Sequence, residues 1–393
     1  MIKFVTFDKN NGAINYRYKN IDKSFYMNID PIIALVNRQT QICIKSKYSY
    51  MELVGDYSIT IFPYDYFDKE LSRFNTQSFT IAARNGCIEF TYVFPEEQMY
   101  KIVIKERTTN GEDLFLESCV YALEKDLFYK IPLIGDLHCH TIYSDGFESP
   151  ENVIDSAMKL GLEFIAITDH NCYEGSVIAE RYAKINKLPI TVLHGEELSS
   201  KYTNAHILSL GADRAICIDE CLTRNSEQTY SEVSFIKALC NNIKMNNGIS
   251  VLCHPLRKPF SIYKPRTDVS LDVLKILIKM DNFDAVEIIS GGQFDDYTAG
   301  QQQYLFASEY GNRNVAYLGV TDSHHYSLDP NCGKRFTLVL ADKASEKGIL
   351  NAISEGKSVA VQLIDDKNAI CYSKLRYVKY ALFILKMKYG LIN

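Results

Sequence analysis

Short runs in which apolar and polar residues alternate fill the first third of the chain. Runs such as YSITIF, IEFTYVF and MYKIVIK have a period of two residues, which is typical of strands with one buried face. Asn-Gly and Pro-Tyr-Asp segments separate such runs and favour tight turns. The pattern predicts that residues 1–130 form a β-sandwich-like accessory domain of antiparallel strands.

From about residue 131 the pattern changes to short, continuously apolar runs that alternate with helical segments. Such runs are typical of buried parallel strands joined by crossover helices. Ser149, Pro150 and Glu151 mark the start of one helix, and Gly161 marks its end. Seven runs are expected to be strands: LIGDLH, FIAIT, ITVLHG, HILSLG, ISVLC, AVEIIS and VAYLGVT. Residues 131–365 are therefore expected to form a closed or nearly closed α/β barrel, with an open doubly wound sheet as the alternative.

The last segment, residues 366–393, has a helical pattern with one apolar stripe and basic residues beside it. Because an apolar stripe needs a partner surface, we expect this helix to pack on the N-terminal domain and not on a membrane. No apolar run approaches the roughly 18 residues of a membrane span, and the N-terminus does not resemble a secretory signal. A cytoplasmic protein without a membrane partner is expected.

Charge and cysteine content exclude some classes of partner and of structural site. The net charge is −5, and Lys and Arg are spread along the chain, so we expect no binding of long nucleic acid. A small phosphorylated substrate is compatible with this charge. The chain has 11 cysteines and no Cys-x-x-Cys pair, which argues against a disulfide framework or a structural zinc site. The oligomeric state is left open.

All eight histidines lie between His138 and His325. Most of them fall where the expected strands end, and in α/β barrels the loops after the strands meet at one point. His138 and His140 end the first strand, whose two-residue period places both imidazoles on one face, about 7 Å apart. Imidazoles together with carboxylates suit zinc, manganese or iron, so we expect a metal centre.

One histidine does not follow this rule. His206 lies at the start of its apolar run, whereas the others lie at or after the end of theirs. Two explanations stay open: either this strand runs in a different direction, or the side chain enters the site from a preceding bend.

The ordered motifs resemble those of the PHP superfamily, named for polymerase and histidinol phosphatase. The motifs are Asp-Leu-His138-Cys-His140-Thr-Ile-Tyr-Ser144-Asp145-Gly, Thr168-Asp169-His170, Gly195-Glu196, Ala205-His206, Cys253-His254-Pro255 and Thr321-Asp322-Ser323-His324. The resemblance covers about residues 133–340 and implies a distorted seven-stranded (βα) barrel, similar to a TIM barrel, with two or three divalent metal ions (Mn, Zn or Fe). Asp145 and the short spacing from Glu196 to His206 are most similar to the branch that contains nucleoside 3',5'-bisphosphate phosphatases and 5'-directed oligoribonucleotidases.

The resemblance also implies which residues hold each ion. The first ion is expected on His138, His140, Glu196 and Asp322, the second on Glu196, His206 and His254, and the third on Asp145, His170 and His324. In this scheme Glu196 bridges the first two ions. Asp136 and Asp169, each beside a ligand, are candidates for orienting the imidazoles, with a capping or surface role as the alternative.

The expected activity is hydrolysis of a phosphomonoester, with a nucleotide or a short oligonucleotide as the favoured substrate. Asp322 or His324 is the candidate general acid, with a role as ligand alone as the alternative. Arg257, which closely follows a ligand motif, is the favoured cation for the substrate phosphate, and Lys334-Arg335 is a second basic pair. A histidinol-phosphate-type phosphatase and a metal-stabilised binding module without catalysis are the competing hypotheses.

Overall fold

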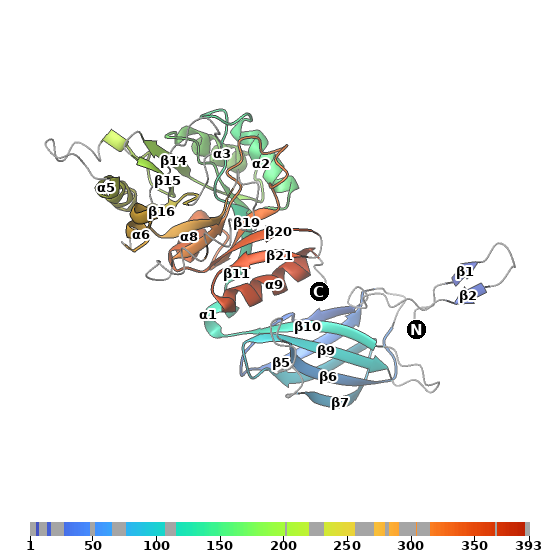
Figure 1. The fold of residues 1–393 in the computed structure, drawn as a ribbon. Coiled ribbons are helices and arrows are strands. Elements are labelled where there is room, and N and C mark those ends of the chain that lie inside the picture. Colours follow the sequence, from blue (N-terminus) through green and yellow to red (C-terminus); the bar gives the residue numbers. More distant parts are fainter. Residues whose placement is uncertain are drawn as a thin grey trace. The chain divides into compact units, whose positions relative to one another are not determined.

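The structure is a computed structural model of the 393-residue chain (Figure 1). It describes residues 5–7, 14–16, 27–47, 52–64, 76–106, 115–200, 203–219, 232–255, 271–279, 283–290, 304, 315–365 and 368–389. The chain separates into two compact units, residues 1–129 and residues 130–393.

Two β-sheets build the N-terminal unit. The first has the strand order β4 (Ile33–Leu35), β10 (Phe115–Leu123), β9 (Gln98–Glu106), β6 (Asp56–Tyr64) and β7 (Gln77–Ala82), and the second has the order β3 (Met27–Asp30), β5 (Gln39–Ser46) and β8 (Cys87–Val93). All neighbours are antiparallel except β10 and β4. Strands β10, β9, β6 and β7 follow one another across the first sheet in Figure 1. A short antiparallel pair, β1 (Val5–Phe7) and β2 (Ile14–Tyr16), and helix α1 (Lys125–Phe128) complete the described part of this unit.

The alternating pattern of these strands produces the core of the unit. In β6 every second residue is buried, and Ile59 and Ile61 are completely inaccessible to solvent. They join Ile42 and Ile44 of β5 and Ile102 of β9 in one apolar cluster. Because both sheets contribute to this cluster, the unit has the sandwich-like arrangement that the two-residue period predicts.

A six-stranded mixed sheet forms one part of the C-terminal unit. Its order is β13 (Thr191–Leu193), β12 (Phe164–Ala166), β11 (Ile131–Asp136), β19 (Arg335–Ala341), β20 (Ser358–Leu363) and β21 (Ala369–Tyr372). The first three strands are parallel, and β19, β20 and β21 continue the sheet in antiparallel pairs.

A five-stranded sheet forms the other part, with the order β14 (Gly195–Ser200), β15 (Thr203–Leu210), β16 (Ile249–Leu252), β17 (Ala285–Ile289) and β18 (Ala316–Gly319). Strands β16, β17 and β18 are parallel, whereas β15 runs antiparallel to both β14 and β16. All seven expected runs contain a strand, but one of them is reversed. The expectation of parallel strands throughout is therefore corrected to a mixed α/β arrangement.

The two sheets of this unit face a common core. Leu133, Phe164 and Leu193 from the first sheet lie in one buried cluster with Val251 and Leu318 from the second. This places the ends of strands from both sheets around a single interior, as in a curled sheet.

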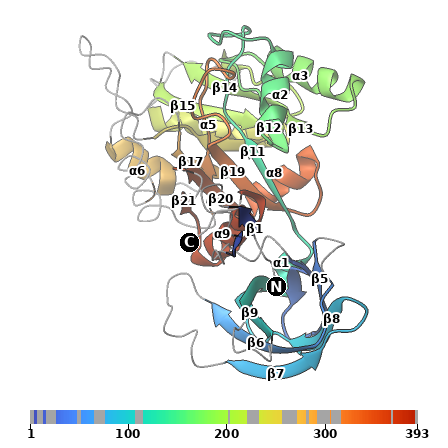
Figure 2. The same cartoon turned by 90° about the vertical axis from the view of Figure 1, so that its right-hand side faces the viewer.

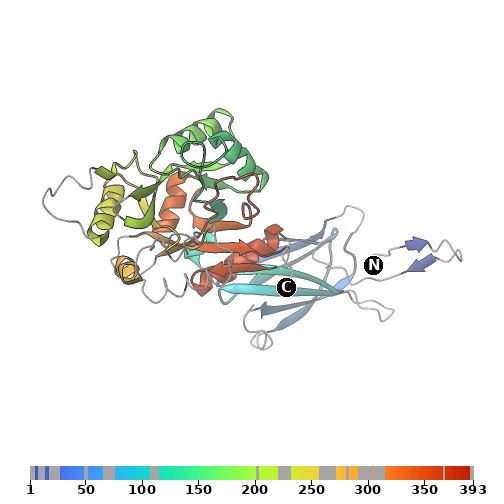
Figure 3. The same cartoon turned by 45° about the horizontal axis from the view of Figure 1, so that its top comes forward.

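Six helices cover the described part of the C-terminal unit. They are α2 (Pro150–Lys159), α3 (Glu174–Ile185), α5 (Glu232–Met245), α6 (Leu271–Lys279), α8 (Glu346–Ser354) and α9 (Leu375–Tyr389). Helix α2 begins as the sequence predicts, since the Ser149 side chain accepts a hydrogen bond from the Asn152 amide and Pro150 takes the first helical position. Helices α2 and α3 lie side by side (Figure 2), and the same pair is seen from another direction in Figure 3.

The C-terminal helix α9 packs against β20 and β21 of its own unit. Its packing on the N-terminal domain stays a prediction. Within the part of the chain that the structure describes, no helix combines the length and apolar character that crossing a membrane requires.

Candidate metal centre

The candidate ligands come from strands of both sheets and meet in the interior of the C-terminal unit. His138 and His140 follow β11, and Asp322 follows β18. The backbone ties these two segments together, because the His140 amide donates to the Ser323 carbonyl at 2.9 Å and the Asp322 amide donates to the His138 carbonyl at 2.9 Å. The two segments thus hold their side chains in a fixed register.

His138, His140, Asp322 and Glu197 form what we call the first ligand group. The Glu197 Oε2 atom lies 3.1 Å from His138 Nε2 and 3.3 Å from His140 Nε2. His140 Nε2 is also 3.2 Å from Asp322 Oδ1. All four residues are buried. Four potential ligand atoms therefore converge on one small volume.

The chemistry of this group fits a divalent cation. His138 Nδ1 lies 2.7 Å from Glu287 Oε1, an acceptor, so Nδ1 carries a proton, and whenever the imidazole is neutral its Nε2 presents a lone pair. This lone pair points at Glu197 Oε2, which is also an acceptor, and at His140 Nε2, 3.2 Å away. Acceptors that face each other in a buried space need a positive charge between them. Imidazole and carboxylate ligands suit zinc, manganese or iron.

Glu197 also belongs to a second ligand group, with His206 and His254. Its other oxygen, Oε1, lies 2.7 Å from His206 Nδ1 and 3.3 Å from His254 Nε2. Burial alone would raise the pKa of Glu197, but His138 and the other imidazoles around it lower the pKa well below its usual value. A carboxylate that stays ionised and offers one oxygen to each group is suited to bridge two cations.

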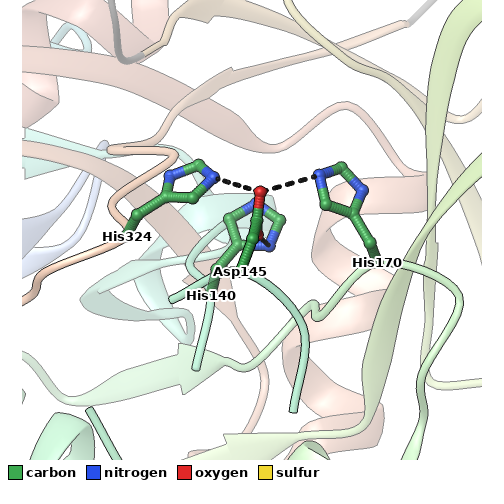
Figure 4. A group of neighbouring side chains, drawn as sticks. All are labelled: His140, Asp145, His170 and His324. Atoms are coloured by element: carbon green, nitrogen blue, oxygen red, sulfur yellow. Dashed lines mark ion pairs between the residues drawn. The ribbon is translucent and has the colours of Figure 1, made fainter. Parts of the chain in front are cut away.

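Asp145, His170 and His324 form the third ligand group, which lies next to His140. Figure 4 shows His324 and His170 pointing at Asp145 from opposite sides, with Asp145 Oδ2 at 3.3 Å from His324 Nε2 and 3.8 Å from His170 Nε2. The Asp145 side chain is 55% exposed, unlike the fully buried His140. The third group thus contains the most exposed side chain of the three ligand groups.

The structure corrects one residue of the expected set: Glu197, and not Glu196, lies among the histidines. The two residues are consecutive in β14 and point to opposite faces of the strand. Glu196 accepts a hydrogen bond from the Ile216 amide at 2.7 Å, away from the ligand groups. Burial raises the pKa of Glu196 to about 7.

The direction of β15 explains the position of His206. Because β15 is antiparallel to β16, its first residues lie beside the carboxyl end of β16, which leads to His254. The Cys253 amide donates to the His206 carbonyl at 3.1 Å. Of the two explanations left open by the sequence, the reversed strand is the one observed.

Asp136 and Asp169 hold backbone segments and do not contact imidazoles directly. Asp169 accepts hydrogen bonds from the Thr141 amide at 2.6 Å, the Thr141 hydroxyl at 2.7 Å and the Ser144 hydroxyl at 2.8 Å. Asp136 accepts from the Thr321 amide at 3.1 Å and the His138 amide at 3.3 Å. Both carboxylates therefore fix the loops that carry the ligands.

The carboxylate that does orient an imidazole is Glu287, which the sequence analysis did not single out. Its Oε1 accepts from His138 Nδ1, and its Oε2 accepts from the His254 amide at 2.8 Å. Glu287 is completely buried in β17. The signal was present in the sequence, because an acidic residue inside the apolar run AVEIIS has to be paired when it is buried.

The ligand loops contain unusual backbone conformations. His254 has φ of 23° and Asp322 has φ of 52°, a region that residues other than glycine rarely occupy. Gly146 is required for a different reason, since a Cβ atom there would lie 2.5 Å from the His140 carbonyl carbon and oxygen. Two residues of the ligand groups thus adopt backbone conformations that cost energy.

Three further residues predicted from the sequence are His324, Arg257 and Arg335. His324 Nδ1 donates to the Asp322 carbonyl at 3.0 Å, which leaves Nε2 facing the third ligand group. Arg257 lies outside the described residues. Arg335, of the second basic pair, is buried and donates to the Ser290 carbonyl at 3.0 Å.

Comparison with known proteins identifies a family model that matches part of the chain. Residues 136–322 match the family model of the PHP domain. The 3',5'-nucleoside bisphosphate phosphatase of Chromobacterium violaceum is 39% identical over 82 residues, 20% of this chain and 28% of the relative. The 5'-3' exoribonuclease Rnm of Salmonella typhimurium is 33% identical over 85 residues, 21% of this chain and 29% of the relative.

Both alignments span less than a third of the relatives' own lengths. A crystal structure of a two-domain protein with a predicted PHP-like metal-dependent phosphoesterase, from Bacteroides vulgatus, has a TM-score of 0.47 and 17% identity. That match covers 61% of this chain and 67% of the other. The family match spans His138 to Asp322 and so includes all but one of the residues in the three ligand groups. The chain therefore contains a match to the PHP domain within residues 136–322.

Proposed function

We propose that this protein is a metal-dependent phosphoesterase that hydrolyses a phosphomonoester, with a nucleotide or a short oligonucleotide as substrate. The observation that carries the proposal is the position of Glu197, whose two carboxylate oxygens face five histidine side chains between them. Such a carboxylate is suited to join adjacent cations in one centre. We also propose that the two sheets of the C-terminal unit make up the distorted seven-stranded barrel that the resemblance implies.

In this proposal each ligand group holds one divalent ion. The first group and the second share Glu197, and the third group is open to solvent. Ions bound in this way would lower the pKa of a coordinated water molecule and neutralise charge on the substrate phosphate. The number of ions is two or three, with manganese, zinc or iron as the metal.

The protein's own side chains have distinct tasks. Glu287 keeps the Nδ1 proton on His138, so that Nε2 stays available as a ligand. Asp322 or His324 is proposed to protonate the leaving oxygen, since both lie where the buried first group meets the exposed third group. Arg257 is proposed to bind phosphate. A cytoplasmic location and an oligomeric assembly stay predictions.

The choice of substrate rests on two observations. Asp145 and the short spacing from Glu196 to His206 along the sequence resemble the bisphosphate phosphatase and oligoribonucleotidase branch. Two relatives also bear the names of a 3',5'-nucleoside bisphosphate phosphatase and a 5'-3' exoribonuclease. Both names describe enzymes that act on nucleotides, and this favours a nucleotide over histidinol phosphate.

The proposal is tested with two neighbouring glutamates. We expect purified protein supplied with manganese to release phosphate from a nucleoside 3',5'-bisphosphate, and more slowly or not at all from histidinol phosphate. Glu197→Gln should abolish turnover and reduce the number of bound ions measured by plasma mass spectrometry. Glu196→Gln is the matched control and should retain both, because Gln can still accept the hydrogen bond from the Ile216 amide. Wild-type protein that binds its full set of ions and hydrolyses no phosphoester would favour the binding-module hypothesis.

A further inference from the structure

Three exposed apolar side chains lie on the loop that carries Asp145 of the third ligand group. Phe147 is 73% exposed, Ile142 is 58% exposed and Tyr143 is 39% exposed. Single exposed apolar residues are common on protein surfaces, but three within six residues at the edge of a polar site are unusual. An aromatic ring left in water beside a binding site is a surface that a ligand can cover.

The backbone fixes the position of Phe147. The Ile142 amide donates to the Glu148 carbonyl at 3.0 Å, and the Gly146 amide donates to the Thr141 carbonyl at 2.9 Å. The Phe147 amide itself donates to the carbonyl of His324 at 2.8 Å. The loop is therefore closed on itself and attached to a residue of the third ligand group, so the ring is held in place before any ligand binds.

One face of the Phe147 ring is already occupied. It stacks on the His325 imidazole, with ring centroids 5.7 Å apart and an angle of 22° between the planes. Glu148 holds this imidazole, since its Oε2 lies 3.3 Å from His325 Nδ1, and the same oxygen accepts from the Ser327 amide at 2.9 Å. With His325 behind it, and with most of its surface exposed, Phe147 presents the other side of its ring to solvent.

Phe147 is close in the chain to the third ligand group. Asp145 and Phe147 are two residues apart, so their Cα atoms are separated by at most about 7.6 Å. A phosphate at the third ligand group would therefore bring the base of the same nucleotide within reach of the ring. Every nucleobase has a flat π-face, and stacking on an aromatic side chain is the common way in which proteins bind bases without reading their sequence.

We propose that Phe147, supported by His325, is a stacking platform for the nucleobase of the substrate. This inference rests on the proposed function, because it assumes that the metal centre binds the phosphate of a nucleotide. It assigns to these two residues a role in choosing nucleotides over phosphate esters that lack a base.

Binding measurements test the platform separately from catalysis. Isothermal titration of the metal-loaded protein should compare adenosine 5'-monophosphate with ribose 5-phosphate, which lacks the base. Phe147→Ala is expected to weaken adenosine 5'-monophosphate binding about 5- to 30-fold, the lower part of the range for base stacking, and to leave ribose 5-phosphate within about twofold. Phe147→Tyr should bind both ligands as the wild type does.

A matched control separates stacking from general apolar contact. Leu328 follows the last ligand motif and is also 73% exposed, but it has no π-face. Leu328→Ala should leave both affinities unchanged. The platform is refuted if Phe147→Ala binds adenosine 5'-monophosphate normally, if it loses both ligands equally, or if Leu328→Ala causes the same loss. Absence of phosphoesterase activity would overturn the proposed function alone, because the platform is judged by binding.

Discussion

Glu287 offers the sharpest test of how this metal centre is organised, because one carboxylate orients two histidines. Oε1 accepts the Nδ1 proton of His138 at 2.7 Å, and Oε2 accepts the amide proton of His254 at 2.8 Å. A glutamine at this position has nearly the same shape but only one acceptor. In Glu287→Gln one of the two protons must therefore face an amide NH₂ group.

Both orientations of that glutamine are unfavourable. If its oxygen faces His138, its NH₂ group opposes the His254 amide, and a buried hydrogen bond worth about 1–3 kcal/mol is lost. If its NH₂ group faces His138, the imidazole has to accept at Nδ1 and carry its proton on Nε2. That proton would occupy the lone pair that points at Glu197 and is needed for a metal ion.

The expected loss follows from these alternatives. Changing a residue that orients a metal-binding histidine typically costs 10- to 100-fold in metal affinity, which is about 1.4–2.7 kcal/mol. We expect Glu287→Gln to weaken binding of the tightest ion by this factor. Competition between the protein and a chelator for zinc or manganese, at constant pH, measures the change.

A partly buried carboxylate directly before the same strand supplies the control. Asp284 lies three residues before Glu287 and accepts from the Ser250 amide at 2.9 Å, without contact to any ligand group. Asp284→Asn should lower the melting temperature as Glu287→Gln does, but it should leave metal affinity unchanged. Wild-type metal affinity in Glu287→Gln would refute the argument that this carboxylate sets the protonation of His138.

Two further changes test other parts of the unit. Gly146→Ala should weaken metal binding at the third ligand group while the fold persists, because the new methyl group would meet the His140 carbonyl. Gly161 has φ of 78° and open space around it, so Gly161→Ala should lower the melting temperature and leave metal affinity unchanged. Glu346 raises the pKa of His194 by accepting its hydrogen bond. The pair's contribution to the free energy of unfolding through His194 is therefore fully present below pH 6.5, and it is lost as the pH rises through the higher pKa of the folded state. The gap in melting temperature between the wild type and Glu346→Gln should therefore shrink above pH 6.5, and a gap that is constant from pH 6 to pH 9 would contradict this.

The sequence predicted which segments form strands, but not which sheet each strand joins. The run ITVLHG illustrates the reason: β13 ends at Leu193, and the chain passes into β14 at Gly195, in the other sheet. A single residue, His194, separates the two strands, so the expected run covers β13 and the start of β14. Pairing is decided by contacts far away in the sequence, so the reversed direction of β15 could not be read from local pattern.

The candidate site was predicted to a similar extent. Histidine positions after strands were correctly expected to meet, since the ends of neighbouring strands share one edge of a sheet. The partners of those histidines were harder to foresee. Asp136 and Asp169 stand beside ligands in the sequence, yet they bind backbone, whereas Glu287 is distant in sequence and binds the His138 imidazole. Closeness in the sequence is therefore a poor guide to contact between side chains.

The register of β14 determines whether Glu196 or Glu197 faces the histidines. A shift of β14 by one residue would exchange the two faces of the strand and bring Glu196 to the histidines without any change in composition. The observed register pairs Gly195 with Leu210, and a Cβ atom on Gly195 would lie 3.0 Å from the side chains of Leu210 and Thr168. A side chain at this crossing would require both neighbours to shift, so glycine is favoured here. The close approach at Gly195 therefore holds β14 in the register that turns Glu197 inward.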